Sequence, residues 1–211
     1  MTDAVLPAEI EAEREPEAGT GALGMWVFLA SEVLFFGGLF VAYLYGRTHW
    51  PEGWSAASRR TDVVLGTVNT ALLLTSNALA ALAVACDEAR RERWAARLLA
   101  ATALLGLAFI AIKGAEWHAD FAQGLAPGPG FALDSVAGAQ EFFALYFVMT
   151  GLHAVHMAAG VGVLGTLAWG RHRRRAWARP AHVEVAALYW HFVDIVWIFL
   201  YPLLYLVSRH G

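Results

Sequence analysis

Apolar residues gather in five long stretches that short polar segments separate. A helix that crosses a bilayer needs about 20 mostly apolar residues, and each stretch reaches that length. The stretches cover Leu23–Gly46, Val63–Ala85, Ala96–Glu116, Gln140–Gly170 and Val183–Ser208. The pattern therefore predicts an all-α fold, a polytopic membrane bundle of five transmembrane helices.

The first 22 residues differ from the rest of the chain. They carry six acidic residues and one basic residue, Arg14. A secretory signal peptide has the opposite arrangement, a basic start followed at once by an apolar stretch. We therefore expect residues 1–22 to form an acidic cytoplasmic tail, flexible or docked on a partner, and residues 23–211 to form the membrane domain.

The basic residues predict the orientation, because short cytoplasmic loops are rich in Arg and Lys. The loops after the second and fourth stretches hold nine arginines, the first loop holds three and the third holds none. The nine are Arg90, Arg91, Arg93, Arg97, Arg171, Arg173, Arg174, Arg175 and Arg179. With five spans, the N-terminus is then cytoplasmic and the C-terminus outside.

Composition narrows the class of protein further. Hydrophobic residues make up 58% and charged residues 16%, whereas soluble domains carry about 25% charged residues. A net charge of −3 gives no basic footprint for a nucleic acid, and the single cysteine excludes an internal disulfide and a multi-cysteine metal site. Four tryptophans that flank the stretches are expected at the membrane interface: Trp50, Trp54, Trp94 and Trp177.

Glu32 is the strongest single signal inside a stretch. It lies about ten residues into the first span, which places it ~15 Å deep, near the midplane. An ionised carboxylate there costs several kcal/mol unless it is paired or hydrated. Two readings remain open: a carboxyl group that exchanges protons, or a neutral side chain whose hydrogen bond joins two helices.

Two histidines, His153 and His156, are three residues apart and share one helix face. Such a pair could ligate a metal or a haem. The alternative, which we favour, is two neutral imidazoles that hydrogen-bond to neighbouring helices.

The last stretch holds His191 and Asp194, again three residues apart, which suits either a relay pairing or a satisfied buried pair. Glu184 lies two turns before His191 at the inner boundary. Near the outer end of the third stretch, Lys113 and Glu116 are expected to neutralise each other or to extend toward the interface.

Depth along each span brings several of these residues to one level. Counted from the cytoplasmic side, Glu32, Asn77, His156, His191 and Asp194 lie ~12–21 Å deep. We therefore predict one polar belt inside the bundle. In that belt, Glu32 should meet at least one of the histidines at 153, 156 and 191.

Three segments of this chain resemble subunit III of the haem–copper respiratory oxidases. They are GMWVFLASEVLFFGGLFVAYLY around Glu32, TGLHAVHMAAG around the histidine pair, and EVAALYWHFVDIVWIFLYPLLYL at the end. The resemblance covers about residues 22–208. The chain departs from the seven-helix form of that family, because the acidic tail stands in place of the first two helices, as in five-helix bacterial versions.

The resemblance implies an accessory, cofactor-free subunit of a cytochrome c oxidase-type complex in a bacterial inner membrane. Its main partner would be subunit I, which holds the haems and copper, with subunit II and possible further subunits beside it and phospholipid in its clefts. In this family the carboxyl at the position of Glu32 reacts with carbodiimides, and the subunit sustains proton uptake. The resemblance implies no catalytic residue and no metal in this chain.

Other functions stay open at this level. One is partnership with a quinol oxidase or a nitric oxide reductase. Another is a stand-alone enzyme or electron carrier that uses the histidine pair as ligands. A third is a small proton-coupled transporter, which the odd number of spans disfavours.

Overall fold

A computed structural model describes the backbone of residues 7–206 and the side chains of residues 23–206. Within that range the chain is helical, and five helices are long and apolar enough to cross a membrane, which confirms the predicted fold class. The elements are α1 (Pro7–His49), α2 (Pro51–Ser58), α3 (Val63–Glu88), α4 (Glu92–Ala122), α5 (Ala139–His172) and α6 (Pro180–Tyr201), with α6 continuing as a π-helix, η1 (Pro202–Leu206).

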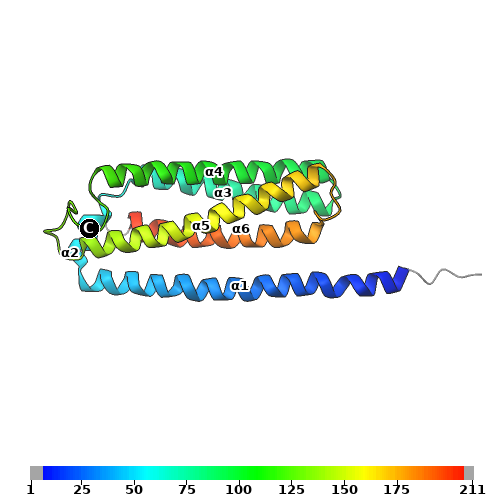
Figure 1. Ribbon diagram of the computed structural model, residues 1–211, viewed down its shortest axis with the longest axis horizontal. Helices are drawn as coiled ribbons and strands as arrows, with labels where there is room; N and C mark the ends of the chain where they lie inside the picture. Colours follow the sequence, from blue (N-terminus) through cyan, green and yellow to red (C-terminus); the bar gives the residue numbers. More distant parts are fainter. Residues whose placement is uncertain (1–6, 207–211) are drawn as a thin grey trace, which may run out of the picture.

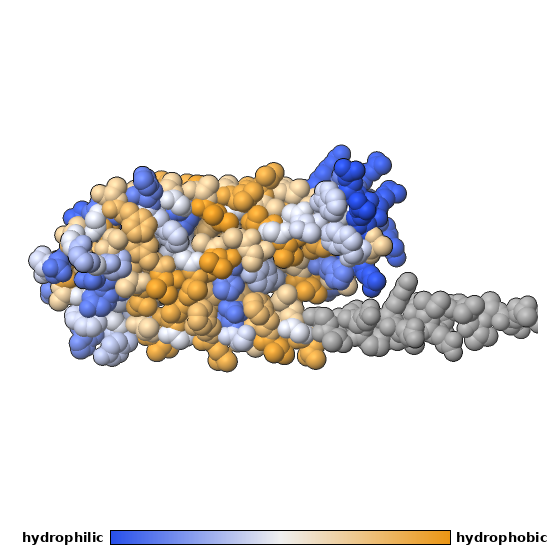
Figure 2. Space-filling model, in the orientation of Figure 1, coloured by the Kyte–Doolittle hydropathy of each residue, from blue (hydrophilic) through white to orange (hydrophobic). Residues whose placement is uncertain are grey.

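Successive long helices run antiparallel, and α3 to α6 form a bundle with α1 along one side (Figure 1). Two ends result. The arginine end carries the loops 89–91 and 173–179, and the α2 end carries α2 and the loop 123–138. Figure 2 shows an apolar band between two more hydrophilic ends. This is the surface that a protein surrounded by lipid requires.

The hydropathy pattern did not predict α2, which begins at Pro51 and lies between α1 and α3. Eight residues are too few for a spanning stretch. Its Trp54, which was expected at the membrane interface, lies inside the protein. The indole is 1% exposed and packs edge-on against Tyr43 and Phe142, with ring centroids 4.7 and 5.4 Å away.

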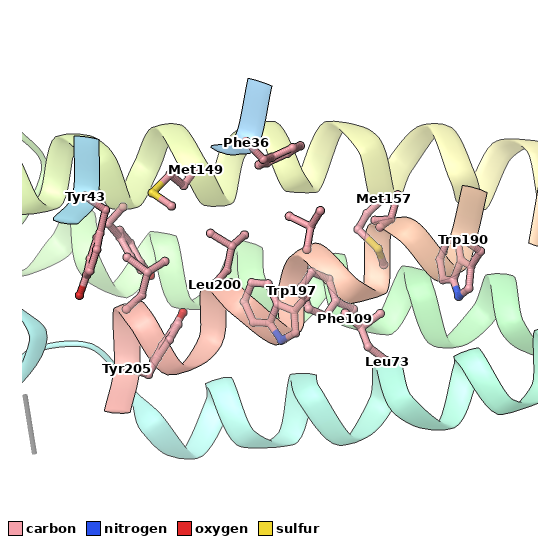
Figure 3. Close-up of a cluster of buried hydrophobic side chains, with 14 of the residues drawn as sticks. Phe36, Tyr43, Leu73, Phe109, Met149, Met157, Trp190, Trp197, Leu200 and Tyr205 are labelled. Atoms are coloured by element: carbon pink, nitrogen blue, oxygen red, sulfur yellow. The ribbon is translucent and has the colours of Figure 1, made fainter. Parts of the chain in front are cut away.

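The core is a continuous column of large side chains along the bundle axis, from Tyr205 near the α2 end to Trp190 toward the arginine end (Figure 3). Two glycines make room for Trp190. A Cβ on Gly106 of α4 would lie 2.5 Å from the indole, and one on Gly160 of α5 would lie 2.8 Å from it. Small residues let helix backbones approach closely in membranes.

The C-terminal end of α6 widens into η1 at Pro202, which has no N–H to donate to the preceding turn. Hydroxyl groups from other elements use the carbonyl groups of this turn. Tyr43 donates to the carbonyl of Leu203, and Ser58 donates to that of Leu204 at 3.1 Å. Both α1 and α2 are thus tied to the last turn of the described chain.

The expected acidic tail, residues 1–22, stays a prediction. Residues 1–6 lie outside the described residues, and over residues 7–22 α1 is described by its backbone.

Candidate functional site

The site centres on Glu32 of α1 and His156 of α5. Glu32 Oε2 lies 3.2 Å from His156 Nε2, and both side chains are mostly buried, with 17% and 18% exposed. The distance is that of an ion pair, although the angles are not those of a regular hydrogen bond. The contact that we expected between Glu32 and one of three histidines is therefore made by His156.

Neighbouring groups hold the His156 ring in place. Its Nδ1 lies 2.8 Å from the carbonyl oxygen of Leu152, one turn earlier. The ring of Phe36 packs edge-on against it at 5.6 Å. Tyr189 of α6 donates to the backbone carbonyl of His156 at 3.0 Å. The pair therefore lies where α1, α5 and α6 meet.

A second polar group joins α3 and α6. His191 Nδ1 hydrogen-bonds with the side-chain oxygen of Asn77, and the Asn77 side chain also faces Asp194. Asp194 is 1% exposed, yet neither of its carboxyl oxygens has a hydrogen bond of regular geometry to a described residue. Glu184, on the same helix, is exposed.

His153 lies inside the bundle among aromatic rings. It is 1% exposed, and its ring centroid lies 5.5 Å from that of Phe109 and 5.1 Å from that of Trp197. Neither ring nitrogen hydrogen-bonds to a described residue. In residues 23–206, no hydrogen bond or ion pair joins His153 or the group of His191 to Glu32, so the expected belt consists of separate groups.

The Lys113 cluster lies farther along the bundle, near the α2 end. Lys113 and Glu116 form an ion pair at 3.1 Å with 2% of each side chain exposed. Of the two expected outcomes, the structure therefore shows that Lys113 and Glu116 neutralise each other, and it does not show them extending toward the interface. Three further side chains complete this cluster: Asp120, Tyr146 and Tyr205.

Sequence reasoning missed several buried polar contacts. Tyr146 and Tyr205 stand in apolar runs, where a tyrosine reads as a packing residue, and only the fold brings them to Lys113. It also missed the buried ion pair of Asp87 and Arg171 at the arginine end. The available signal was an acidic residue at the end of one span and a basic residue at the end of another.

The described part of the chain, residues 23–206, holds no group of three or more His, Cys, Asp or Glu residues placed to bind a metal ion. In place of such a group it has buried polar pairs between helices. Spanning helices with charged side chains turned into the bundle define the class as an integral membrane protein of the α-helical bundle type.

The comparisons with known proteins identify the family. The sequence matches the model of the family described as cytochrome c oxidase subunit III over residues 8–209. The chain belongs to this family, and it is therefore a subunit of an oxidase complex.

Individual relatives agree with the family match. A cytochrome c oxidase subunit 3 from Thermostichus vulcanus is 32% identical over 192 residues, which cover 89% of this chain and 87% of the relative. A cytochrome bo(3) ubiquinol oxidase subunit 3 from Pseudomonas aeruginosa is 28% identical, with 90% and 86% covered. A heme-copper oxidase subunit I+III from Aeropyrum pernix is 33% identical over 196 residues, which cover 87% of this chain and 22% of that longer protein.

Proposed function

We propose that this chain is an accessory subunit of a proton-translocating terminal oxidase, that it has no redox centre of its own, and that it stabilises subunit I and sustains proton uptake. The contact between Glu32 and His156 carries this proposal. A carboxyl group near the middle of a membrane span is costly, and such residues mark proton paths and other functional sites.

The contacts of the pair support the idea of a shared proton. The carbonyl oxygen of Leu152 can only accept, so His156 Nδ1 carries a hydrogen in that contact. In a neutral imidazole Nε2 is then an acceptor, and it faces Glu32 Oε2. Two acceptors in contact need a proton between them. We therefore propose that the pair holds one, on the carboxyl group or on the ring.

Replacing Glu32 with Gln tests this role. The amide keeps a similar shape and can still donate a hydrogen bond to Nε2, so we expect the oxidase complex to assemble. It cannot exchange a proton, so proton uptake and oxygen consumption by the purified complex should fall several-fold and inactivation during turnover should accelerate. The matched control is Glu184→Gln, at an exposed glutamate of α6. Unchanged proton uptake in E32Q would contradict the proposal.

We propose that the arginine end faces the cytoplasm of a bacterial cell whose inner membrane holds the chain. The exposed arginines at this end support the assignment, because basic loops stay on the cytoplasmic side. A cysteine placed at Arg173, in the loop after α5, should react with an impermeant thiol reagent only after the cells are opened. Labelling in intact cells would show that the arginine end lies outside and would contradict the proposed topology.

An apolar cavity supports a role in binding phospholipid. It has a volume of about 730 Å³ and lies between α1, α5 and α6. Its lining includes Phe28, Val163, Leu167 and Tyr189. We propose that an acyl chain occupies it with the head group toward the arginine end. Val163→Trp, which fills the cavity, should reduce the phospholipid that copurifies, and an unchanged lipid content would contradict this assignment.

The electron donor defines a second candidate function. The relative from Pseudomonas aeruginosa is a ubiquinol oxidase subunit, and that similarity favours partnership with a quinol oxidase as the alternative to a cytochrome c oxidase. Oxygen consumption by the purified complex with reduced cytochrome c and with ubiquinol decides between the two. We expect cytochrome c to be the donor.

A further inference from the structure

The Lys113 cluster joins two helices and the π-helix turn at a place that the proposed function does not use. Lys113, Glu116 and Asp120 belong to α4, Tyr146 to α5 and Tyr205 to η1. All five residues are at most 4% exposed. Charged side chains this deeply buried are found where partners satisfy them.

The hydrogen bonds of the cluster use every proton of Lys113. Its ammonium donates to Glu116 Oε2 at 3.1 Å, to the Tyr146 hydroxyl at 2.9 Å and to the Tyr205 hydroxyl at 2.5 Å. Tyr205 in turn donates to Glu116 Oε1 at 2.6 Å. Glu116 thus accepts on both oxygens and pairs with the ammonium, which is the environment of a carboxylate.

Tyr146 has one hydroxyl proton and two acidic neighbours. Its oxygen lies 2.9 Å from Glu116 Oε1 and 3.0 Å from Asp120 Oδ2. An ionised carboxyl group only accepts, so one hydroxyl proton cannot fully satisfy both contacts. A proton on one of the two carboxyl groups supplies the missing hydrogen-bond donor, since that group then donates to the tyrosine oxygen.

Asp120 is the better place for that proton. Among residues 23–206, no Lys, Arg or His side chain forms an ion pair with it. The groups that face it are Lys113 and Glu116 on α4, Tyr146 on α5 and Asp62 at the start of α3. Asp62 is exposed and caps α3, so two buried carboxyl groups, those of Glu116 and Asp120, share one ammonium. Leaving Asp120 ionised would give the buried cluster a net negative charge.

We propose that the Lys113 cluster is a binding site for one exchangeable proton, which Asp120 holds. In the loaded state the Asp120 carboxyl group donates to Tyr146, whose own proton goes to Glu116. When Asp120 releases its proton to a water molecule, it becomes a carboxylate and takes the hydroxyl proton of Tyr146 as its hydrogen bond. Glu116 then loses one donor and keeps Lys113 and Tyr205.

Asp120 lies near one end of the bundle, which is where we propose that the proton enters and leaves. It lies in the last turn of α4, two residues before the helix ends at Ala122, at the α2 end of the bundle. Its backbone carbonyl accepts from Leu125 in the loop that follows. This site is therefore close to the aqueous phase opposite the arginine end.

Infrared spectroscopy of the full chain in lipid nanodiscs tests the proposal. Asp194→Asn serves as the background, so that the other deeply buried unpaired aspartate does not contribute. At neutral pH we expect a C=O band of a protonated carboxylic acid that moves with carbon-13 in the aspartate side chains and stays with carbon-13 in glutamate. Asp120→Asn should remove this band. Asp134→Asn, at an exposed aspartate of the same end, should keep it.

Two features keep the test decisive if the Asp120 variant folds poorly. The isotope labels need no substitution at 120. Tyr146→Phe keeps the ring and deletes the hydroxyl, so the band should persist at a shifted frequency. Absence of any aspartate band, survival of the band in Asp120→Asn, or a band that moves only with labelled glutamate would overturn the proposal. The proposal would also be overturned if the cluster bound a sodium ion in place of the proton.

Discussion

The buried side chain of Arg171 connects three segments at the arginine end. It forms an ion pair with Asp87 at the end of α3 and donates to the carbonyl of Ala178 at 2.9 Å in the loop before α6. The guanidinium also lies 4.0 Å from Glu92 of α4. The positive charge of Arg171, in the last turn of α5, therefore serves the packing of the bundle.

Replacing Arg171 with Met should destabilise the fold, because it leaves the carboxylate of Asp87 buried without a partner. Breaking a buried ion pair costs about 3–5 kcal/mol. Thermal unfolding of the chain in detergent, followed by tryptophan fluorescence, should show a lower midpoint. Arg173→Met, at an exposed arginine in the loop that follows α5, is the control. Equal midpoints for both variants would contradict the assigned role.

Individual contacts could be predicted from the sequence only where depth and polarity restrict the choice. Glu32 needed a polar partner at its own depth, and a histidine supplies it. The spacing of Lys113 and Glu116 gave their pairing as one of two expected outcomes, because residues three apart share a helix face. The partners that come from other helices could not be predicted, since the rotation of each helix about its axis sets which tyrosine meets the ammonium.

At the scale of elements, α4, α5 and α6 are held at close range by Trp190. The indole fits between Gly106 and Gly160, and its Nε1 donates to Ser76 of α3 at 3.1 Å. One side chain of α6 therefore contacts α3, α4 and α5.

Gly160→Val should separate α5 from α6, because the new Cβ would lie 2.8 Å from the Trp190 ring. Overpacking of this kind costs about 1–3 kcal/mol, and we expect lower thermal stability together with a shift in tryptophan emission. Gly165→Val on the same helix is the matched control, since no atom lies within 4 Å of its added Cβ. If both variants unfold alike, Trp190 does not set the helix spacing.

The helices themselves followed from hydropathy, because lipid requires long apolar helices with satisfied backbones. All five stretches correspond to helices over the residues that the structure describes, which end at 206, and the ends were less well predicted. The third stretch was expected to begin at Ala96, whereas α4 begins at Glu92 and extends to Ala122. Polar residues in the first and last turns of a helix lie beyond the apolar layer of the membrane and still keep their backbone hydrogen bonds. Hydropathy alone therefore does not mark where a helix ends.

At the scale of the whole molecule, α1 is much less covered than the other spans. In its most apolar window 17% of the residues are buried, compared with 50% in the last span. One side of α1 exposes large apolar side chains, with Leu34 78% and Val41 66% exposed. Gly38 lies between them on the same face. We propose that this face contacts subunit I.

Gly38→Leu tests that contact. No atom of the chain lies within 4 Å of a Cβ added here, so the thermal stability of the isolated chain should change by less than about 0.5 kcal/mol. Recovery of the chain with a tagged subunit I should fall several-fold, because a large side chain keeps the partner helix away. Gly114→Leu on α4, also without close atoms, should be recovered normally. Normal recovery of G38L would place the contact elsewhere.

The distance in sequence between Glu32 and His156 also has a consequence for synthesis. The ribosome adds about 5–20 residues per second, and His156 follows about 120 residues after Glu32. For roughly 6–24 s the nascent first span must therefore remain in the bilayer or its insertion machinery without the partner of its carboxyl group. We expect E32Q chains to integrate faster than the wild type in timed translation. The carboxylate must take up a proton to enter the membrane in a neutral form, whereas the amide is already neutral.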